Sequence, residues 1–235
     1  MSEHRRVLAC MDDLISQWEQ AADRRSIFLT CYSMMTRNML AAVEAGDFHD
    51  PAWVLRLLVH FAGYYFAALE ACETGGPASP AVWVLAFDAA RQPRTQAIQN
   101  LILGVNAHIN YDLVLALADL LEPEWQALSP EQRRQRYDDH CHVNTIIAQT
   151  VDAVQDNVLE RHAPAMDLID RAFGRLDEWL ISSLITRWRD QVWELAVQYV
   201  ETASHEARER MRLEVEAASL QRGRLILMDW SADNQ

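Results

Sequence analysis

Proline placement constrains the fold of this 235-residue chain more than any other feature, because most prolines stand where a helix would begin. Asp50–Pro51 puts a capping carboxylate before a proline in the first helical turn, and Ser79–Pro80 repeats that arrangement. The sequence SPEQ at residues 129–132 is a capping box with its proline at the first helical position. Between these breaks, apolar residues recur with the helical period. The predicted helices span residues 4–21, 24–45, 51–72, 80–90, 94–121, 130–159, 165–201 and 203–220.

The composition favours the same fold class. Half of the residues are hydrophobic, and the chain has only 7 glycines and 7 prolines. The high fraction of hydrophobic residues excludes a disordered chain. The small number of glycines and prolines, which are typical turn residues, argues against an all-β fold. We therefore expect an all-α bundle of about seven or eight helices, built as a single domain over residues 1–235. The tryptophan-containing segment 165–222 could pack as a C-terminal helical subdomain, and residues 223–230 (GRLILMDW) could form a short strand.

Charge and cysteine content limit the partners and the compartment. The formal net charge is −13, and all 21 basic residues are arginine. An acidic surface argues against nucleic acid and anionic membranes, because both are bound through cations. Acidic residues interrupt the apolar run near the N-terminus, and no uncharged stretch reaches about 18 residues, so neither a signal peptide nor a membrane span is expected. The four cysteines are scattered without a CxxC pair, which favours reduced thiols and a cytoplasmic protein.

The most informative segment is LGVNAHINYD at residues 103–112, which places four polar side chains in the middle of a long, otherwise apolar helix. Each buried polar side chain left unpaired would cost about 1–3 kcal/mol. At about 100° per residue, His108 and Asp112 lie one turn apart on the same apolar face, whereas Asn106 and Asn110 point to another side. These side chains therefore either satisfy one another or hold a ligand.

The predicted helix over residues 51–72 carries polar residues that could face the same site. Arg56, His60 and Tyr64 share one stripe of this helix, and Tyr65 follows directly. His60 lies mid-helix in an apolar context, which makes it a candidate ligand or acid–base group.

The predicted helix over residues 130–159 supplies a second set. Its apolar face has His140 and Asn144 on its edge, one turn apart, and Asp139 precedes them. His142 aligns instead with charged residues and is expected to face solvent. We therefore expect His140 to point inward.

Three hypotheses fit this arrangement, and the first is a metal-dependent enzyme. A histidine and a carboxylate one turn apart can hold an ion on a rigid helix, and bundles commonly build metal sites from facing helices. The ligands of one divalent zinc, iron or manganese ion would be His60, His108, Asp112 and His140. Such a site would hydrolyse an ester or phosphoester of a small, partly apolar substrate. The residues that bind substrate would be Arg56, Asn106, Asn110, Asp139 and Asn144.

The second hypothesis is a metal-free biosynthetic enzyme, such as a cyclase or lyase. Asp112 would orient His108 as a general base, and Tyr64 or Tyr65 would donate a proton. The third hypothesis is a non-catalytic helical binding module, in which the histidine–aspartate and asparagine pairs only satisfy one another in the core. No nucleotide cofactor is expected in any of the three, and the tryptophan-containing C-terminal helices could bury a homodimer interface.

The box LGVNAHINYDL resembles the hallmark LGMNAHINFDL of an uncharacterised bacterial all-helical family, a domain of unknown function. Further matches are Tyr32 and Thr36 to its Y-x3-T element, GDFHDP to its G-x-F-x-D element, and Arg189 and Trp193 to its R-x3-W element. Asp139 and Asn144 match its D-F-x-x-V-N element, although His140 stands where that family usually has Phe. The resemblance implies a helical fold and no established activity.

Two shorter stretches are similar to the zinc-dependent phospholipase C and single-strand nuclease superfamily. HFAGYYFAAL and NAHINYD resemble its HFxGDxHQPLH and NxHxxWD stretches. The similarity implies that His60, His108 and Asp112 are zinc ligands. Tyr64 stands where those enzymes have an Asp ligand, and their second histidine and amino-terminal tryptophan are missing, so at most one metal is expected.

Overall fold

All regular elements in the described part of the chain are helices. The computed structural model describes residues 2–75, 79–154 and 175–228. In chain order its elements are α1 (Glu3–Gln20), α2 (Ser26–Ala45), α3 (Pro51–Thr74), α4 (Ala81–Arg91), α5 (Ala97–Ala107), the π-helical turn η1 (His108–Asp112), α6 (Leu113–Leu121), α7 (Pro130–Val154), α10 (Arg175–Glu201) and α11 (His205–Met228). Because α5, η1 and α6 run on without a break, the described residues form eight helices. The predicted all-α bundle is confirmed.

Two of the predicted caps set the helix starts. Asp50 accepts a hydrogen bond from the backbone N–H of Trp53 at 2.9 Å, which starts α3. Ser129 and Gln132 bond reciprocally at 2.9 and 3.2 Å, which is the capping box expected at the start of α7. At the start of α4, Pro80 rather than Ser79 occupies the cap position.

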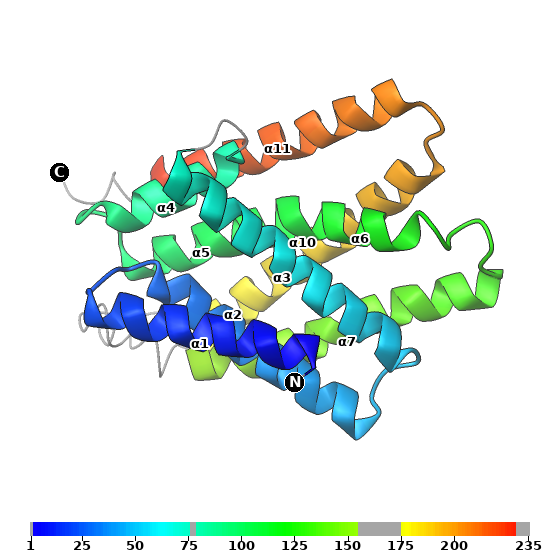
Figure 1. Ribbon diagram of the computed structural model, residues 1–235, viewed down its shortest axis with the longest axis horizontal. Coiled ribbons are helices and arrows are strands. Elements are labelled where there is room, and N and C mark those ends of the chain that lie inside the picture. Colours follow the sequence, from blue (N-terminus) through cyan, green and yellow to red (C-terminus); the bar gives the residue numbers. More distant parts are fainter. Residues whose placement is uncertain (1, 76–78, 155–174, 229–235) are drawn as a thin grey trace.

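The continuous helix from Ala97 to Leu121 runs through the middle of the bundle (Figure 1). Its α5 part packs against α2, α4 and α11, and its α6 part packs against α3 and α10. By length and composition alone, both this helix and α3 could cross a membrane, and 89% of the apolar window of the central helix is buried inside the protein. The core helix of a bundle is apolar on all sides because neighbouring helices surround it.

One core joins all the described helices. A single cluster of buried apolar side chains draws on every element from Met11 in α1 to Val215 in α11. Trp188 and Trp193 of α10 belong to this cluster, so the described part of the segment 165–222 shares the core of the preceding helices. The N-terminal residues 165–174 of that segment lie outside the described residues.

The C-terminal strand expectation is wrong for residues 223–228, because α11 continues to Met228. α11 runs beside α4 and α5 (Figure 1). The backbone of Gly223 approaches so closely that a Cβ atom there would meet a methyl carbon of Leu85 at 2.8 Å. Packing against two helices therefore outweighs the short alternating pattern, which was too weak to specify a strand.

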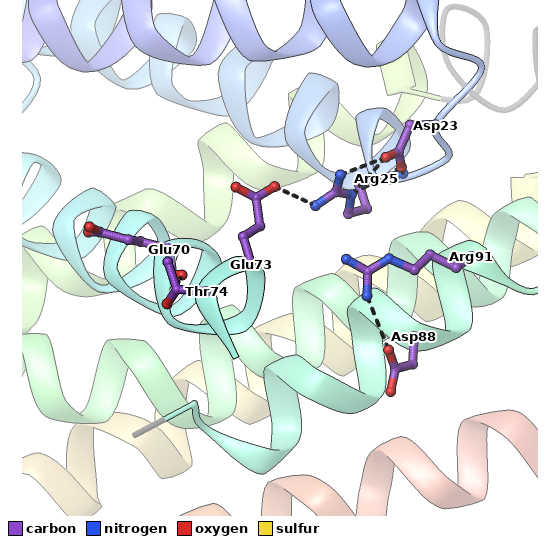
Figure 2. Close-up of polar contacts among 7 residues, drawn as sticks. All are labelled: Asp23, Arg25, Glu70, Glu73, Thr74, Asp88 and Arg91. Atoms are coloured by element: carbon purple, nitrogen blue, oxygen red, sulfur yellow. Dashed lines mark hydrogen bonds and ion pairs between the residues drawn. The ribbon is translucent and has the colours of Figure 1, made fainter. Parts of the chain in front are cut away.

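A charged cluster ties the start of α2 to the end of α3. Figure 2 shows Arg25 between Asp23 and Glu73, with contacts of 2.7 and 2.9 Å. The Arg25 guanidinium also lies over the Trp18 ring, 4.5 Å from its centroid. This arrangement holds together the two helices that supply most of the aromatic rings of the site described next.

Candidate functional site

An apolar cavity of about 170 Å³ lies among α2, α3, the α5–η1 junction, α7 and α10. Most of its lining side chains are aliphatic or aromatic. Ligand pockets are typically of this kind, with a few polar groups that fix the orientation of the ligand. The polar side chains on the lining are Tyr32, Thr36, Trp53, His108, Asp139, His140, Thr150 and Arg189.

The last five residues of the NAHINYD box form the π-helical turn η1 (His108–Asp112), which carries the pair at the edge of the cavity. Such turns interrupt α-helices and are frequent at functional sites. Nδ1 of His108 lies 3.0 Å from Oδ2 of Asp112, and the Trp83 indole N–H donates to both carboxyl oxygens at 3.1 and 3.0 Å. The structure thus brings together the two residues whose spacing suggested a pair.

Burial moves both members of the pair toward their uncharged forms. It raises the pKa of Asp112 well above its ordinary value, against the opposing effect of the Trp83 hydrogen bond. Burial also lowers the pKa of His108 well below its ordinary value. An uncharged pair has the carboxyl O–H donating to Nδ1, which leaves the ring hydrogen of His108 on Nε2.

Aromatic rings hold the His108 imidazole in one orientation. The Phe61 ring stacks on it with a centroid distance of 3.6 Å and an interplanar angle of 9°. Tyr32 meets it edge-on at 4.2 Å, and Phe28 lies 5.7 Å away. The backbone of Gly104 makes this cage possible, because a Cβ atom there would meet Phe28 ring carbon Cγ at 2.4 Å.

Four buried polar atoms on the cavity lining have no hydrogen-bond partner among the described residues. They are the Tyr32 hydroxyl, the Thr36 hydroxyl, Nε1 of Trp53 and Nε2 of His108. A buried polar atom without a partner costs about 1–3 kcal/mol, so native proteins keep few of them. Four of the seven such atoms found among the described residues belong to residues that line this one cavity.

Arg189 forms a second polar group on the cavity lining. Its Nε donates to Oδ1 of Asn144 at 2.8 Å, and its Nη2 donates to the backbone carbonyl of His140 at 2.6 Å. The His140 ring donates from Nε2 to the carbonyl of Arg189 at 3.0 Å, because a carbonyl oxygen can only accept. Burial and the nearby guanidinium lower the pKa of His140, which favours the neutral ring. His140 does point inward, as predicted, and it is engaged by α10 rather than by His108.

Asp139 lines the cavity but serves the loop between α2 and α3. Its two carboxylate oxygens accept the backbone N–H groups of His49 and Asp50 at 2.7 and 2.9 Å. Both oxygens therefore have partners, and the geometry assigns Asp139 a positioning role for the start of α3.

Several predicted site residues lie away from the cavity. The ring of His60 is 40% exposed and lies 2.8 Å from Asp119 of α6, and the Tyr64 hydroxyl donates to the same carboxylate at 2.7 Å. Arg56 is exposed on α3. Tyr65 is fully buried beside Trp83 and is absent from the cavity lining.

The two asparagines of the box face α11. The Asn110 amide donates to Oδ1 of Asn106 at 3.0 Å, and the Asn106 amide donates to the carbonyl of Ser219 at 2.9 Å. The Ser219 hydroxyl returns a bond to the carbonyl of Asn110 at 3.0 Å. These side chains fix the packing of α11 on the central helix and are absent from the cavity lining, so their predicted role in substrate binding stays a prediction.

The predicted metal-ligand set is not assembled. His60 lies at the surface with Asp119, and the ring nitrogens of His140 face Arg189. In the described ranges, no group of three or more His, Cys, Asp and Glu side chains is arranged to hold a metal ion. The metal hypothesis requires His60 of α3 to face His108 and Asp112 of the central helix. The rotation of α3 about its axis instead turns His60 toward the surface.

Sequence reasoning overlooked some of the residues that matter most here. Trp53 and Trp83 received no role as indole donors, and Tyr32, Thr36 and Arg189 entered only as matches to family elements. A usable signal existed for two of them, because Tyr32 and Thr36 are one turn apart on the apolar helix α2.

Comparison with known proteins identifies one family. The model of a family of unknown function, DUF5995, matches residues 5–229. The chain therefore belongs to this family. Neither the curated proteins nor the solved structures gave a match. The similarity to the zinc-dependent phospholipase C superfamily stays a prediction.

Proposed function

We propose that this protein is an enzyme that binds a small, mainly apolar molecule in the cavity and exchanges a proton with it through His108. The observation that carries the proposal is the set of four buried polar atoms without described partners on one apolar lining. Oxygen functions on the ligand would pair with these atoms, and its hydrocarbon part would fill the remaining volume.

The pair of His108 and Asp112 has the arrangement of a general acid. His108 would transfer the proton on its Nε2 to a substrate oxygen, while its Nδ1 takes the carboxyl proton of Asp112. The pair would then hold a neutral imidazole with hydrogen on Nδ1 and an ionised carboxylate, which the Trp83 indole N–H stabilises at 3.0 and 3.1 Å. General acid–base catalysis of this kind contributes roughly 10²–10⁴ in rate.

This geometry favours the metal-free hypothesis, an isomerase, cyclase or lyase, over metal-dependent hydrolysis. Hydrolysis at a metal would need His60 and His140 beside His108, and both have other partners. A proton-transfer site needs only a fixed ring, an orienting carboxyl and an apolar surrounding, all of which are supplied by described residues.

Binding of 2-octanone, a neutral ketone with an apolar chain, tests the proposal by isothermal titration calorimetry. We expect saturable binding to the wild-type protein and at least a tenfold loss of affinity in His108→Phe. His142→Phe is the matched control, because His142 lies on α7 outside the cavity lining, and its affinity should equal that of the wild type. Absence of binding to the wild-type protein would contradict the proposal.

Stability provides a second readout that a purely structural role would not give. Thr36→Val removes an unpartnered hydroxyl, so it should raise the free energy of unfolding by about 1 kcal/mol and weaken 2-octanone binding. Thr150→Val is the control, because the Thr150 hydroxyl donates to the Ile146 carbonyl at 2.7 Å and accepts from Asn38 at 2.8 Å. The control should lose about 1–2 kcal/mol. Equal losses from both substitutions would mean that the Thr36 hydroxyl has a structural partner.

A further inference from the structure

Arg189 is a buried cation on the lining of the ligand cavity. Only 4% of the residue is exposed. Burial lowers the pKa of its guanidinium to about 10, which still leaves the group protonated at neutral pH. None of the ion pairs formed among the described residues involves Arg189. A buried charge without a counter-charge is strongly unfavourable, and breaking a buried pair is costly for the same reason.

The hydrogen bonds of Arg189 leave one nitrogen open. Nε donates to the Asn144 amide oxygen at 2.8 Å, and Nη2 donates to the His140 carbonyl at 2.6 Å and lies 3.3 Å from Nδ1 of His140. All these groups are neutral. Nη1, which carries two N–H groups, has no acceptor among the described residues. The guanidinium is therefore held in place by neutral groups while one end is available to a ligand.

No carboxyl group of the described residues forms an ion pair with this cation. Asp139 also lines the cavity, but both of its oxygens accept backbone N–H groups of the α2–α3 loop. Burial raises the pKa of Asp112 well above its ordinary value, and its carboxyl group is engaged by Trp83 and His108. The groups of the described residues that act electrostatically on Arg189 are the Cys141 thiol and the carboxylate of Asp190, the next residue on α10. Neither forms an ion pair with Arg189 among the described residues.

We infer that the molecule bound in this cavity carries a carboxylate that pairs with Nη1 of Arg189. This inference rests on the proposed function and names its substrate class: a small amphipathic acid whose apolar chain occupies the cavity between Arg189 and His108. A carboxylate fits because guanidinium groups bind it through charge-assisted N–H···O bonds. The apolar lining increases the strength of this pairing, since little water competes for either group.

Calorimetric titration of the full chain with octanoate tests the inference, and 2-octanone is the neutral ligand of matched chain length. Wild-type protein should bind octanoate at least tenfold more tightly than 2-octanone. Arg189→Met should remove that preference. Arg189→Lys retains the charge and should retain the preference for octanoate. Arg187→Met, at an exposed neighbouring position of α10, is the control and should bind both ligands as the wild type does.

Each outcome supports or overturns the inference. If 2-octanone binds and octanoate binds no more tightly, the inference is overturned and the proposed function stands. If neither ligand binds, both are overturned. If octyl phosphate binds more tightly than octanoate, the assignment of a carboxylate is overturned in favour of a phosphate. The comparison of octanoate with 2-octanone on the wild-type protein tests whether the site prefers a carboxylate even if Arg189→Met fails to fold.

Discussion

Replacing Asp112 with asparagine tests the uncharged state of the buried pair directly. The amide oxygen can accept from the Trp83 indole as the carboxyl does at 3.0–3.1 Å, and the amide N–H can donate to Nδ1 of His108. A neutral carboxyl is thus exchanged for a neutral amide of nearly the same shape. At about pH 4, near the ordinary pKa of an aspartate, we expect the free energy of unfolding to change by no more than about 1 kcal/mol.

The difference between the two proteins should then grow as the pH rises. The pKa of Asp112 in the folded state is raised above its ordinary value of 3.8, so above that pH the folded state retains a proton that the unfolded state has lost. The wild-type protein therefore loses stability as the pH rises, by up to about 1.4 kcal/mol per pH unit. Asp112→Asn lacks this titration, and His108 contributes nearly equally to both proteins. Between pH 5 and 7, the variant should gain up to about 3 kcal/mol relative to wild type.

Urea denaturation monitored by tryptophan fluorescence at pH 4, 5, 6 and 7 measures this difference. Asp88→Asn is the matched control, because the Asp88 side chain is 60% exposed on α4 and should show no comparable pH trend. A stability difference between Asp112→Asn and wild type that stays constant over this range would refute the reasoning, since it would mean that Asp112 is ionised in the folded protein. The general acid would then have to be reassigned.

Two further predictions concern packing around the site. Gly104→Ala should lower the free energy of unfolding by about 1–3 kcal/mol, because its Cβ would meet the Phe28 ring at 2.4 Å. Gly63→Ala has nothing within 4 Å of the added Cβ, so it should raise the free energy of unfolding by about 0.5–1 kcal/mol through helix propensity. Urea midpoints measure both, and a gain in both variants would show that the ring moves aside freely. Asp139→Ala should lose about 1–3 kcal/mol, because the backbone N–H groups of His49 and Asp50 lose their acceptors. A change below about 0.5 kcal/mol would mean that water replaces the carboxylate there.

Features that depend on local spacing could be predicted from the sequence. The Asp50 cap and the box of Ser129 and Gln132 form as their order in the chain predicts. The contact of His108 with Asp112 likewise follows from a separation of four residues on a helix. The inward orientation of His140 followed from its place at the edge of an apolar face.

Relations between helices could not be predicted in the same way. The ring of His60 faces outward and lies 2.8 Å from Asp119 of another helix, and nothing near His60 in the chain indicates that partner. The π-helical turn shifts the rotation of every residue that follows it in the central helix, which periodicity at a constant angle does not anticipate.

The sequence by itself determined the helical class, several helix boundaries and the pairing of His108 with Asp112, because these depend on propensity, capping and separation along one helix. Only the tertiary structure decided that Tyr32, Thr36 and Trp53 leave polar atoms without described partners around one cavity, and that Arg189 is buried without a counter-charge among described residues. Those properties depend on which side chains of distant segments meet, and that is set by the packing angle and rotation of each helix against its neighbours.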